Sequence, residues 1–426
     1  MAETILRTGE VSRRRFLTAS AVAALAAPVI IRPGRARAAG EPIKVGFVTP
    51  KTGPLAFFGE PDDFVLAHFE AALHAGVDGV PIEIVVKDTQ SNPSRAAELA
   101  AQLILDDEVS LLIAGGGPDT VNPVADQAEV NGVPCLCNAS PWQSFVLGRN
   151  GTPDKGFEYG FLFAFGLEDI AAAYLALWST LETNRKVGLI LPNDADGNAW
   201  GDADFGFPPM LTAAGYEVVD SGRYTPMADD FSAQIAAFKA AGVDIVMGTM
   251  LPPEFASFWA QAAQQGLRPK VVTIGKTLLL PTTVEAIGAR ADGLSTEIAW
   301  TPAYPFQSGT GGITAGALAE EWEAATGRQW TQPLGLRHAL IDVTIDVLRR
   351  AGKGADRDAV VAAIRSTDTE TVLGPVNWST SPIANVAKTP VVAGQWLKSG
   401  ERFDLSIGAN PTTLPIPVQA PLRALT

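Results

Sequence analysis

The chain has 426 residues, of which 47% are hydrophobic, and a mean hydropathy of +0.14, which suffices for two globular domains. The formal net charge is −14, and it becomes −19 once the seven arginines and two glutamates of the first 38 residues are set aside. Such an acidic chain is not expected to bind nucleic acid or anionic lipid.

Residues 1–38 have the features of a twin-arginine signal peptide. The motif Ser12–Leu17 (SRRRFL) precedes an apolar stretch from Ala19 to Ile31, and Ala36-Arg37-Ala38 fits a cleavage site. We therefore predict export to the periplasm by the twin-arginine route. Because no cysteine stands at the cleavage point and no later stretch is apolar enough to span a bilayer, we expect no membrane anchor on the mature chain.

From Glu41 onward, strand patterns alternate with helix patterns. The first series has four predicted strands, at 43–48, 82–86, 111–114 and 134–137, with helices at about 61–75 and 93–105. Short turns between parallel strands and helices predict a doubly wound sheet.

The third of these strands ends on three glycines, Gly115 to Gly117, and a helical pattern resumes at once. A turn of this kind places backbone N–H groups beside the positive end of a helix dipole, so it can hold an anionic group. The spacing does not extend to G-x-G-x-x-G, because Thr120 stands where the last glycine belongs.

A second series of alternating predicted strands and helices begins after residue 166. Its predicted strands lie at 187–191, 217–221, 245–247 and 271–274, and its helices at about 168–182, 206–215, 230–241 and 253–265. The final third contains predicted strands at 294–300, 371–376 and 391–397, and helices at about 315–326, 335–351 and 357–365. This order predicts two lobes, 39–165 with about 300–372 and 166–299 with about 373–426, and a cleft at the carboxyl ends of the strands.

Residues typical of catalytic and metal sites are few. The chain has three histidines, and the spacing of His68 and His74 does not bring them to one helix face, so we expect no metal pair. Cys135 and Cys137 follow a strand pattern on one face, and we interpret them as small buried hydrophobic residues. We therefore expect a binding protein with no cofactor rather than an enzyme.

The segment Asp194–Asn198 resembles the start of a calcium loop, but it lacks the required glycine and the final glutamate, since Ala199 and Phe205 take those positions. We interpret its acids as loop and helix-cap residues.

Aromatic residues follow several predicted strands, and together they suit an amphipathic organic ligand. They are Phe57, Phe58, Trp142, Trp200 and Trp300. Lys276, just after a strand, either bonds a ligand carboxylate or is a solvated surface lysine. Asp119 either caps the helix after the glycine turn or faces the ligand.

Four segments give the chain a family resemblance: Gly53–Gly59, Lys87–Pro93, Asp230–Ser232 and Leu373–Val376. With these motifs the chain resembles the type I periplasmic binding proteins of ABC importers, in the group that binds hydrophobic or branched-chain amino acids and amides. The resemblance implies an α/β fold of two lobes joined by three crossings, each lobe a doubly wound, mostly parallel sheet with helices on both faces.

The resemblance also implies where a ligand lies. Its carboxylate would be bound by the loop Gly117–Thr120 and by Ala139 and Ser140, while Trp200, Leu251 and residues near Lys276 would close from the other lobe. The full set of expected ligand-binding residues is Phe58, Gly117, Asp119, Thr120, Ala139, Ser140, Trp142, Trp200, Leu251, Lys276 and Trp300.

Two departures from the family bear on the ligand. Pro118-Asp119-Thr120 replaces a Ser-rich pattern, and Lys276 stands where amino acid binders of the family often have a glutamate for the ligand ammonium. Because a buried ammonium without a partner is costly, we expect a carboxylate with an apolar or aromatic body rather than a standard branched-chain amino acid.

The expected function is that of a monomeric periplasmic receptor that delivers a small organic ligand to an ABC permease and its ATPase, closing about a hinge. A branched-chain amino acid or amide receptor, and a sensory protein that presents its ligand to a membrane receptor, are alternatives of the same fold. A third alternative is an exported redox enzyme, which the missing dinucleotide fingerprint disfavours.

Overall fold

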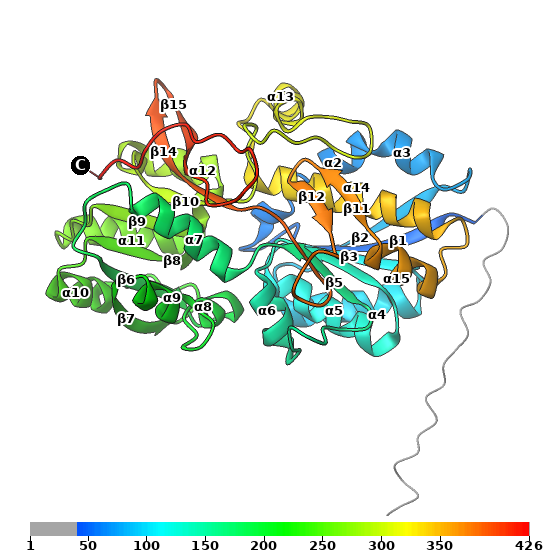
Figure 1. The fold of residues 1–426 in the computed structure, drawn as a ribbon, viewed down its shortest axis with the longest axis horizontal. Helices are drawn as coiled ribbons and strands as arrows, with labels where there is room; N and C mark the ends of the chain where they lie inside the picture. Colours follow the sequence, from blue (N-terminus) through cyan, green and yellow to red (C-terminus); the bar gives the residue numbers. More distant parts are fainter. Residues whose placement is uncertain (1–40, 426) are drawn as a thin grey trace, which may run out of the picture. The chain divides into compact units, whose positions relative to one another are not determined.

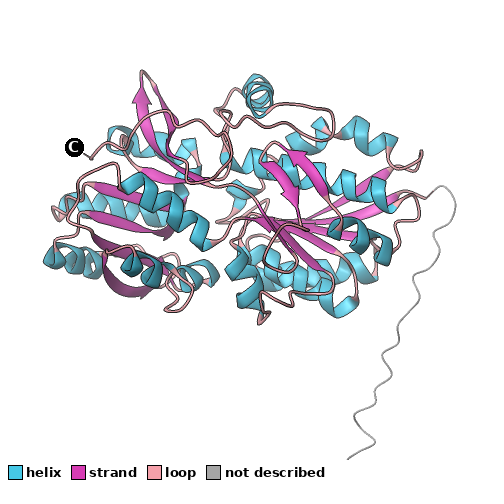
Figure 2. Ribbon diagram, in the orientation of Figure 1, coloured by secondary structure: helices cyan, strands magenta, loops and turns pink. Residues whose placement is uncertain are grey.

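The structure, which is a computed structural model, describes residues 41–425 (Figures 1 and 2). It contains two large open sheets, each with helices on both faces, and a separate two-stranded sheet. This agrees with the predicted fold class. The predicted signal peptide, residues 1–38, lies outside the described residues.

The first sheet has six strands, all parallel, in the order β13-β5-β4-β3-β1-β2. The strands are β1 (Ile43–Thr49), β2 (Ile82–Asp88), β3 (Leu111–Ala114), β4 (Cys135–Asn138), β5 (Gly160–Ala164) and β13 (Val386–Lys388). Together with the helices packed on it, this sheet is called the first lobe.

Helices cover both faces of the first sheet, so that its inner strands are buried on both sides, whereas the edge strand β2 is only partly buried. Phe47 packs in one cluster with Val65 of α2, whereas Val48, the next residue, packs with Leu103 of α4 and Val121 of α5. The helices of this lobe are η1 (Ala56–Phe58), α2 (Asp62–His68), α3 (Glu70–Ala75), α4 (Pro93–Leu105), α5 (Pro118–Asn131), α6 (Trp142–Val146), η2 (Leu147–Arg149), α13 (Ala315–Thr326), α14 (Gln332–Ala351) and α15 (Arg357–Arg365).

The second sheet has seven strands in the order β15-β14-β10-β9-β8-β6-β7, of which β14 and β15 are antiparallel to their neighbours. The strands are β6 (Lys186–Pro192), β7 (Glu217–Tyr224), β8 (Ile245–Met250), β9 (Val271–Lys276), β10 (Ser295–Ile298), β14 (Val392–Ser399) and β15 (Arg402–Ala409). With its helices it is called the second lobe.

The second sheet is likewise covered on both sides. Gly188 of β6 lies under Phe238 of α10, while Thr273, on the opposite face by the strand register, accepts a hydrogen bond from Trp178 of α7. The helices of this lobe are α7 (Leu167–Trp178), α8 (Ala195–Trp200), α9 (Phe207–Ala213), α10 (Ser232–Ala241), α11 (Pro252–Gln264), η3 (Thr277–Leu279), α12 (Pro281–Ile287) and η4 (Gly288–Ala291).

The chain passes between the lobes three times: after β5, after β10 and after β13. The last passage comes later than the boundary expected near residue 373. Residues 374–388 stay with the first lobe, because β12 (Gly374–Asn377) forms a hairpin with β11 (Asp368–Thr371), and β13 then pairs with β5. The second lobe resumes only at β14.

Some predicted elements differ in detail. The helix expected at 61–75 is divided at Phe69 into α2 and α3, and the strand expected at 371–376 is a turn flanked by β11 and β12. The sequence patterns did not reveal β5, β13 or β15. Among helices of the described residues, none has the length and apolar character needed to cross a bilayer.

Both lobes share one strand order. In the first it is β2-β1-β3-β4-β5 and in the second β7-β6-β8-β9-β10, so each sheet reverses its winding between its first and third strands. At such a switch point the loops after the two strands separate and leave a crevice. The fold therefore positions a site at the carboxyl ends of β1, β3, β6 and β8.

Candidate ligand-binding site between the lobes

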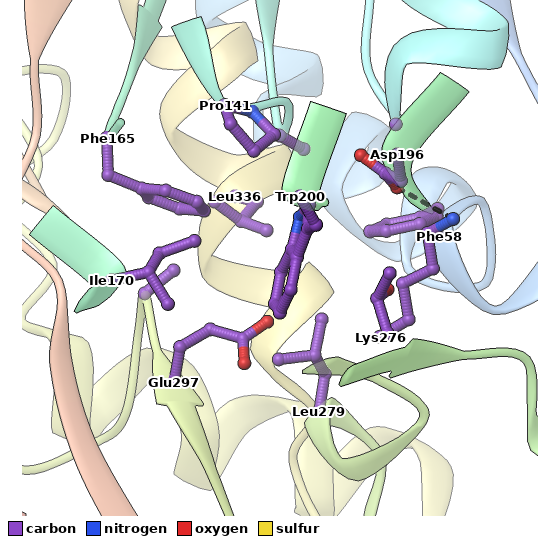
Figure 3. Close-up of a pocket in the computed structure, with 14 residues that line it drawn as sticks. Phe58, Pro141, Phe165, Ile170, Asp196, Trp200, Lys276, Leu279, Glu297 and Leu336 are labelled. Carbon is purple, nitrogen blue, oxygen red and sulfur yellow. Dashed lines mark ion pairs between the residues drawn. The ribbon is translucent and has the colours of Figure 1, made fainter. Parts of the chain in front are cut away.

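One cavity lies where the carboxyl edges of the two sheets face each other, with about 490 Å³ of space between atoms, part of it open to solvent (Figure 3). The wall is mostly apolar, with a few polar side chains, as in sites for small organic molecules. The lining residues are Phe58, Gly117, Ala139, Pro141, Phe165, Ile170, Asp196, Trp200, Thr249, Lys276, Leu279, Glu297, Ala299 and Leu336.

Lys276 is the cationic residue of the cavity wall. It stands at the end of β9 with φ at +59°, a conformation that non-glycine residues seldom adopt, and only 7% of it is exposed. Its Nζ lies 2.7 Å from Asp196 Oδ2 and 3.5 Å from Asp194 Oδ2. Burial by itself would lower the pKa of Lys276, but the carboxylates of Asp196 and Asp194 stabilise the ammonium more strongly, so its pKa is raised. The surface-lysine interpretation is therefore wrong.

The two acids come from the segment that resembles a calcium loop. Asp194 caps α8, since its Oδ1 accepts a hydrogen bond from Gly197 N–H at 2.7 Å. Both acids also bind Lys276, a role that the sequence did not indicate. Within residues 41–425, no group of three His, Cys, Asp or Glu side chains is arranged to hold a metal ion.

Asp119 of the first lobe belongs to the same charged cluster as Lys276, Asp194 and Asp196 of the second lobe. It is the second residue of α5, whose N-cap is Gly117, and no side-chain hydrogen bond caps that helix. Burial raises the pKa of Asp119 to about 6; Lys276 opposes the shift, and Asp194 and Asp196 add to it. No side-chain hydrogen bond supports the helix-cap interpretation, and Asp119 interacts electrostatically with charged groups of the second lobe; that it faces a ligand stays a prediction.

The glycine turn is shaped by close contacts. Gly116 and Gly117 have φ at +111° and +87°, and Gly117 N–H donates to Ala139 O at 3.0 Å. This amide, expected to meet an anion, is therefore already bonded to the loop after β4. Ala139 itself has φ at +59°, so a strained residue stands at the cavity in each lobe.

Arg337 of α14 forms hydrogen bonds with the loops that follow β1 and β3. It is 2% exposed and donates hydrogen bonds to Phe58 O, Thr49 Oγ1 and Gly115 O, and its Nε lies 2.7 Å from Asp62 Oδ1. A Cβ on Gly115 would stand 2.2 Å from Arg337 Nη1, which explains the first glycine of the turn. One buried guanidinium thus links the loops after β1 and β3.

An apolar cluster joins the lobes beside the cavity. Leu55 and Phe58 of the first lobe pack with Leu279 and Leu280 of the second, and Leu251 lies against this cluster without lining the cavity. On the other side of Trp200 in the view of Figure 3 lies the carboxyl of Glu297.

Five of the eleven predicted residues line the cavity: Phe58, Gly117, Ala139, Trp200 and Lys276. The other six lie behind or beside the wall, namely Asp119, Thr120, Ser140, Trp142, Leu251 and Trp300. Thr120 and Ser140 are buried, and Trp142 Nε1 donates to Glu168 at 2.9 Å instead of facing the cavity. Trp300 is fully buried, with its ring against Trp330 and over Gly335.

Several wall residues were not predicted as ligand contacts. Phe165 and Ala299 lie at the passages between lobes, and Ile170 and Leu336 come from helices that the sequence places beside a sheet rather than at its edge. Leu279 comes from the short helix η3, which the sequence patterns did not predict. Glu297 lies inside a strand pattern, and its acidic side chain in an apolar run was the available signal.

Comparison with known proteins gives a consistent result. A family model described as periplasmic binding protein matches residues 42–401. The Leu/Ile/Val-binding protein homolog 7 of Brucella suis is 25% identical over 374 residues, which is 84% of this chain and 87% of that protein.

Solved structures show the same fold. A leucine binding protein, LivK, from Thermotoga maritima superposes with a TM-score of 0.72 at 22% identity, covering 87% of this chain and all of that one. A solute binding protein of an ABC transporter from Rhodopseudomonas palustris, in complex with 3,4-dihydroxy benzoic acid, gives 0.70 at 21% identity, covering 88% and 98%.

Proposed function

This chain belongs to the family of periplasmic binding proteins, and on that premise we propose that it is the solute receptor of an ABC importer for a small carboxylate with an apolar or aromatic body. The cavity between the lobes is the observation that carries this proposal. Phe58, Phe165 and Trp200 offer flat apolar surfaces, and Lys276 offers a buried cation at the same wall. The R. palustris protein of the same fold, with its bound aromatic acid, supports this ligand class.

The mechanism is closure about the three passages. A ligand in the cavity contacts both lobes, so it binds the closed arrangement better than an open one and shifts the population toward closure. The permease then recognises the closed shape. Residues 1–38 direct export to the periplasm by the twin-arginine route, and the mature chain acts as a monomer.

An amino acid is the second candidate ligand. Lys276 is already bound to Asp196 and Asp194, and Glu297 and Asp119 add further acidic groups near the cavity. An ammonium would find partners there, whereas a carboxylate must compete with Asp196 for Lys276. The B. suis relative, named for leucine, isoleucine and valine, supports this candidate.

Titration calorimetry of the mature protein with benzoate, 4-hydroxybenzoate, leucine and valine separates the two. The first proposal predicts binding of an aromatic acid and weak or absent binding of both amino acids. Sub-micromolar affinity for leucine or valine, with no response to aromatic acids, contradicts it.

The pH dependence of the ligand affinity is a second, independent test of the two candidate ligands. Because the pKa of Asp119 is about 6, this acid is charged at pH 7.5 and mostly protonated at pH 5.5, where benzoate remains ionised. An anionic ligand then meets one negative charge fewer, so its affinity should rise on going to pH 5.5, by up to about tenfold for one pKa unit of coupling. The affinity of a ligand bound through its ammonium should fall.

A further inference from the structure

Three residues form a row across the carboxyl edge of the second sheet. Thr249 of β8 pairs with Gly275 of β9, and Ser295 of β10 pairs with Thr273, which places Glu297 beside Gly275. Residues in register on parallel strands project to the same face. Thr249 and Glu297 therefore flank a position without a side chain, and both line the cavity.

Gly275 leaves that position open. A Cβ on it would stand 2.9 Å from Glu297 Oε1 and 2.8 Å from Trp200 Cη2, closer than a Cβ makes such contacts. The end of the indole and the carboxyl thus share the space over Gly275, as Figure 3 shows for Trp200 and Glu297. The glycine permits an aromatic wall and a polar group to meet at one point.

Glu297 is held rigidly. Its Oε2 accepts hydrogen bonds from Tyr174 O–H at 2.5 Å and Thr296 O–H at 3.0 Å, and its backbone carbonyl accepts from Gln332 Nε2. Tyr174 is fully buried and stacked on Trp178. The orientation of the carboxyl is therefore set without a ligand, as a binding group requires.

The row keeps unused hydrogen-bonding capacity. Within residues 41–425 no side chain donates to Glu297 Oε1, no Lys, Arg or His forms an ion pair with Glu297, and Thr249 Oγ1 has no hydrogen-bond partner. Thr249 is 1% exposed and Glu297 is 5% exposed. Burial raises the pKa of Glu297 above its ordinary value, in spite of the hydrogen bonds that its carboxyl receives from Tyr174, Thr296 and the backbone at Glu297 and Lys276. Buried polar groups left in this state favour a partner from the ligand.

We propose that Thr249 and Glu297 form a specificity subsite that binds a hydrogen-bond donor on the ligand, distinct from the Lys276–Asp196 pair. The inference rests on the proposed function and narrows it, because the ligand must carry a hydroxyl or an ammonium as well as its apolar body. Glu297 accepts from that group, and the hydroxyl of Thr249 accepts from it as well or, where the group is a hydroxyl, donates to its oxygen.

The test compares ligands that differ only in the donor. Calorimetry on the mature protein uses 4-hydroxybenzoate against benzoate, and leucine against 4-methylpentanoate, so that the first pair tests a hydroxyl and the second an ammonium. In at least one pair the donor-bearing ligand should bind about tenfold to a hundredfold more tightly, the range for a hydrogen bond to a charged group.

Glu297→Gln should reduce that ratio to about threefold or less, because the amide loses the acidic acceptor while keeping its shape. Thr249→Val should reduce it also, and it introduces no polar atom. The matched control is Glu254→Gln, since Glu254 is another buried glutamate, accepts a hydrogen bond from Tyr224 O–H at 2.8 Å and does not line the cavity. The control should leave the ratio unchanged.

The outcomes separate this inference from the proposed function. If a ligand binds and its donor ratio is near one in the wild type, or stays unchanged in both Glu297→Gln and Thr249→Val, the subsite is overturned while the receptor proposal stands. If neither pair binds, both are overturned. Thermal unfolding of each variant shows that it is folded, and the wild-type ratios alone decide the case if Glu297→Gln does not fold.

Discussion

At the scale of single residues, the proposed ligand preference depends on the balance of charge around Lys276. One ammonium is shared by two close carboxylates, and Asp119 adds a third acid from the opposite lobe. Buried acids in excess of their cations are costly unless some take up protons. The raised pKa of Asp119, about 6, reflects that excess.

Asp119→Asn should therefore stabilise the protein at pH 7.5, by about 1–2 kcal/mol. Because its folded-state pKa is raised, Asp119 takes up a proton on folding between about pH 4 and pH 6, and its unfavourable effect grows as the pH rises through that range. Thermal unfolding at pH 7.5, 6 and 4 checks this.

The advantage of the variant should shrink toward pH 4, where wild-type Asp119 is protonated in the folded state. Asp106→Asn, an exposed acid that follows α4, serves as a control and should show no such trend. A variant less stable than the wild type at pH 7.5 contradicts the charge argument.

At the scale of elements, α14 does more than cover the first sheet. Its residue Arg337 reaches the loops after β1 and β3 and pairs with Asp62 of α2, with both side chains almost fully buried. Three elements distant in sequence are thus fixed relative to one another through one cation. This arrangement positions Phe58 and the glycine turn at the cavity.

Arg337→Met should lower the free energy of unfolding by about 3–5 kcal/mol, since it leaves Asp62 buried without its partner. It should also weaken ligand binding, because Phe58 and Gly117 lose their support. Denaturant unfolding and calorimetry measure the two effects.

The double variant Asp62→Asn with Arg337→Met tests the cause. It should recover part of the lost stability, because no unpaired buried charge remains. If the double variant is as unstable as the sum of the single variants predicts, the pair is not coupled and the argument fails.

At the scale of the whole described molecule, the passages between the lobes are tied together. Glu168 and Asp169, at the start of α7, both form ion pairs with Lys388 at the end of β13, and Thr389 N–H donates to Ala164 O. Two of the three passages thus lie side by side. We propose that the lobes close about this joint, with the cavity and the apolar cluster on the faces that approach each other.

Leu279→Asp should weaken binding of any ligand roughly tenfold to a hundredfold, which corresponds to the loss of about 1.5–3 kcal/mol of leucine burial between the lobes. The stability of each lobe should change little, because Leu279 packs with Leu55 and Phe58 across the cavity edge. Calorimetry gives the affinity, and small-angle scattering with saturating ligand gives the degree of closure.

Leu105→Asp is the matched control, since Leu105 is 61% exposed at the end of α4. It should bind as the wild type does. If the Leu279→Asp variant has the same ligand affinity and the same degree of closure as this control, the apolar cluster has no part in closure.

The alternating strand and helix patterns in the sequence correctly predicted the elements that are long and amphipathic. The helix 315–326 and the strands of both parallel series lie where expected, because each has a periodic apolar face that a sheet or a neighbouring helix must cover. The strand β5 was missed, although it is buried along its whole length in the same way as β3 and β4, which were predicted. The three-residue strand β13 was also missed. It is defined by main-chain hydrogen bonds to β5, and such bonds do not produce a pattern of apolar and polar side chains in the sequence.

The two α/β series could be predicted from the amino-acid sequence, because the apolar periodicity of each strand and helix is a local property. The carboxyl edge followed from the alternation of parallel strands and helices, and the family resemblance supplied the five predicted residues that line the cavity. Which groups meet at that edge depends on the packing of the folded chain. Lys276 forms ion pairs with two carboxylates, Trp300 is buried in the core, and Glu297 lines the cavity. Each of these findings depends on contacts between segments that are far apart in the chain. Burial and pairing arise from packing, and packing is not encoded at any single position.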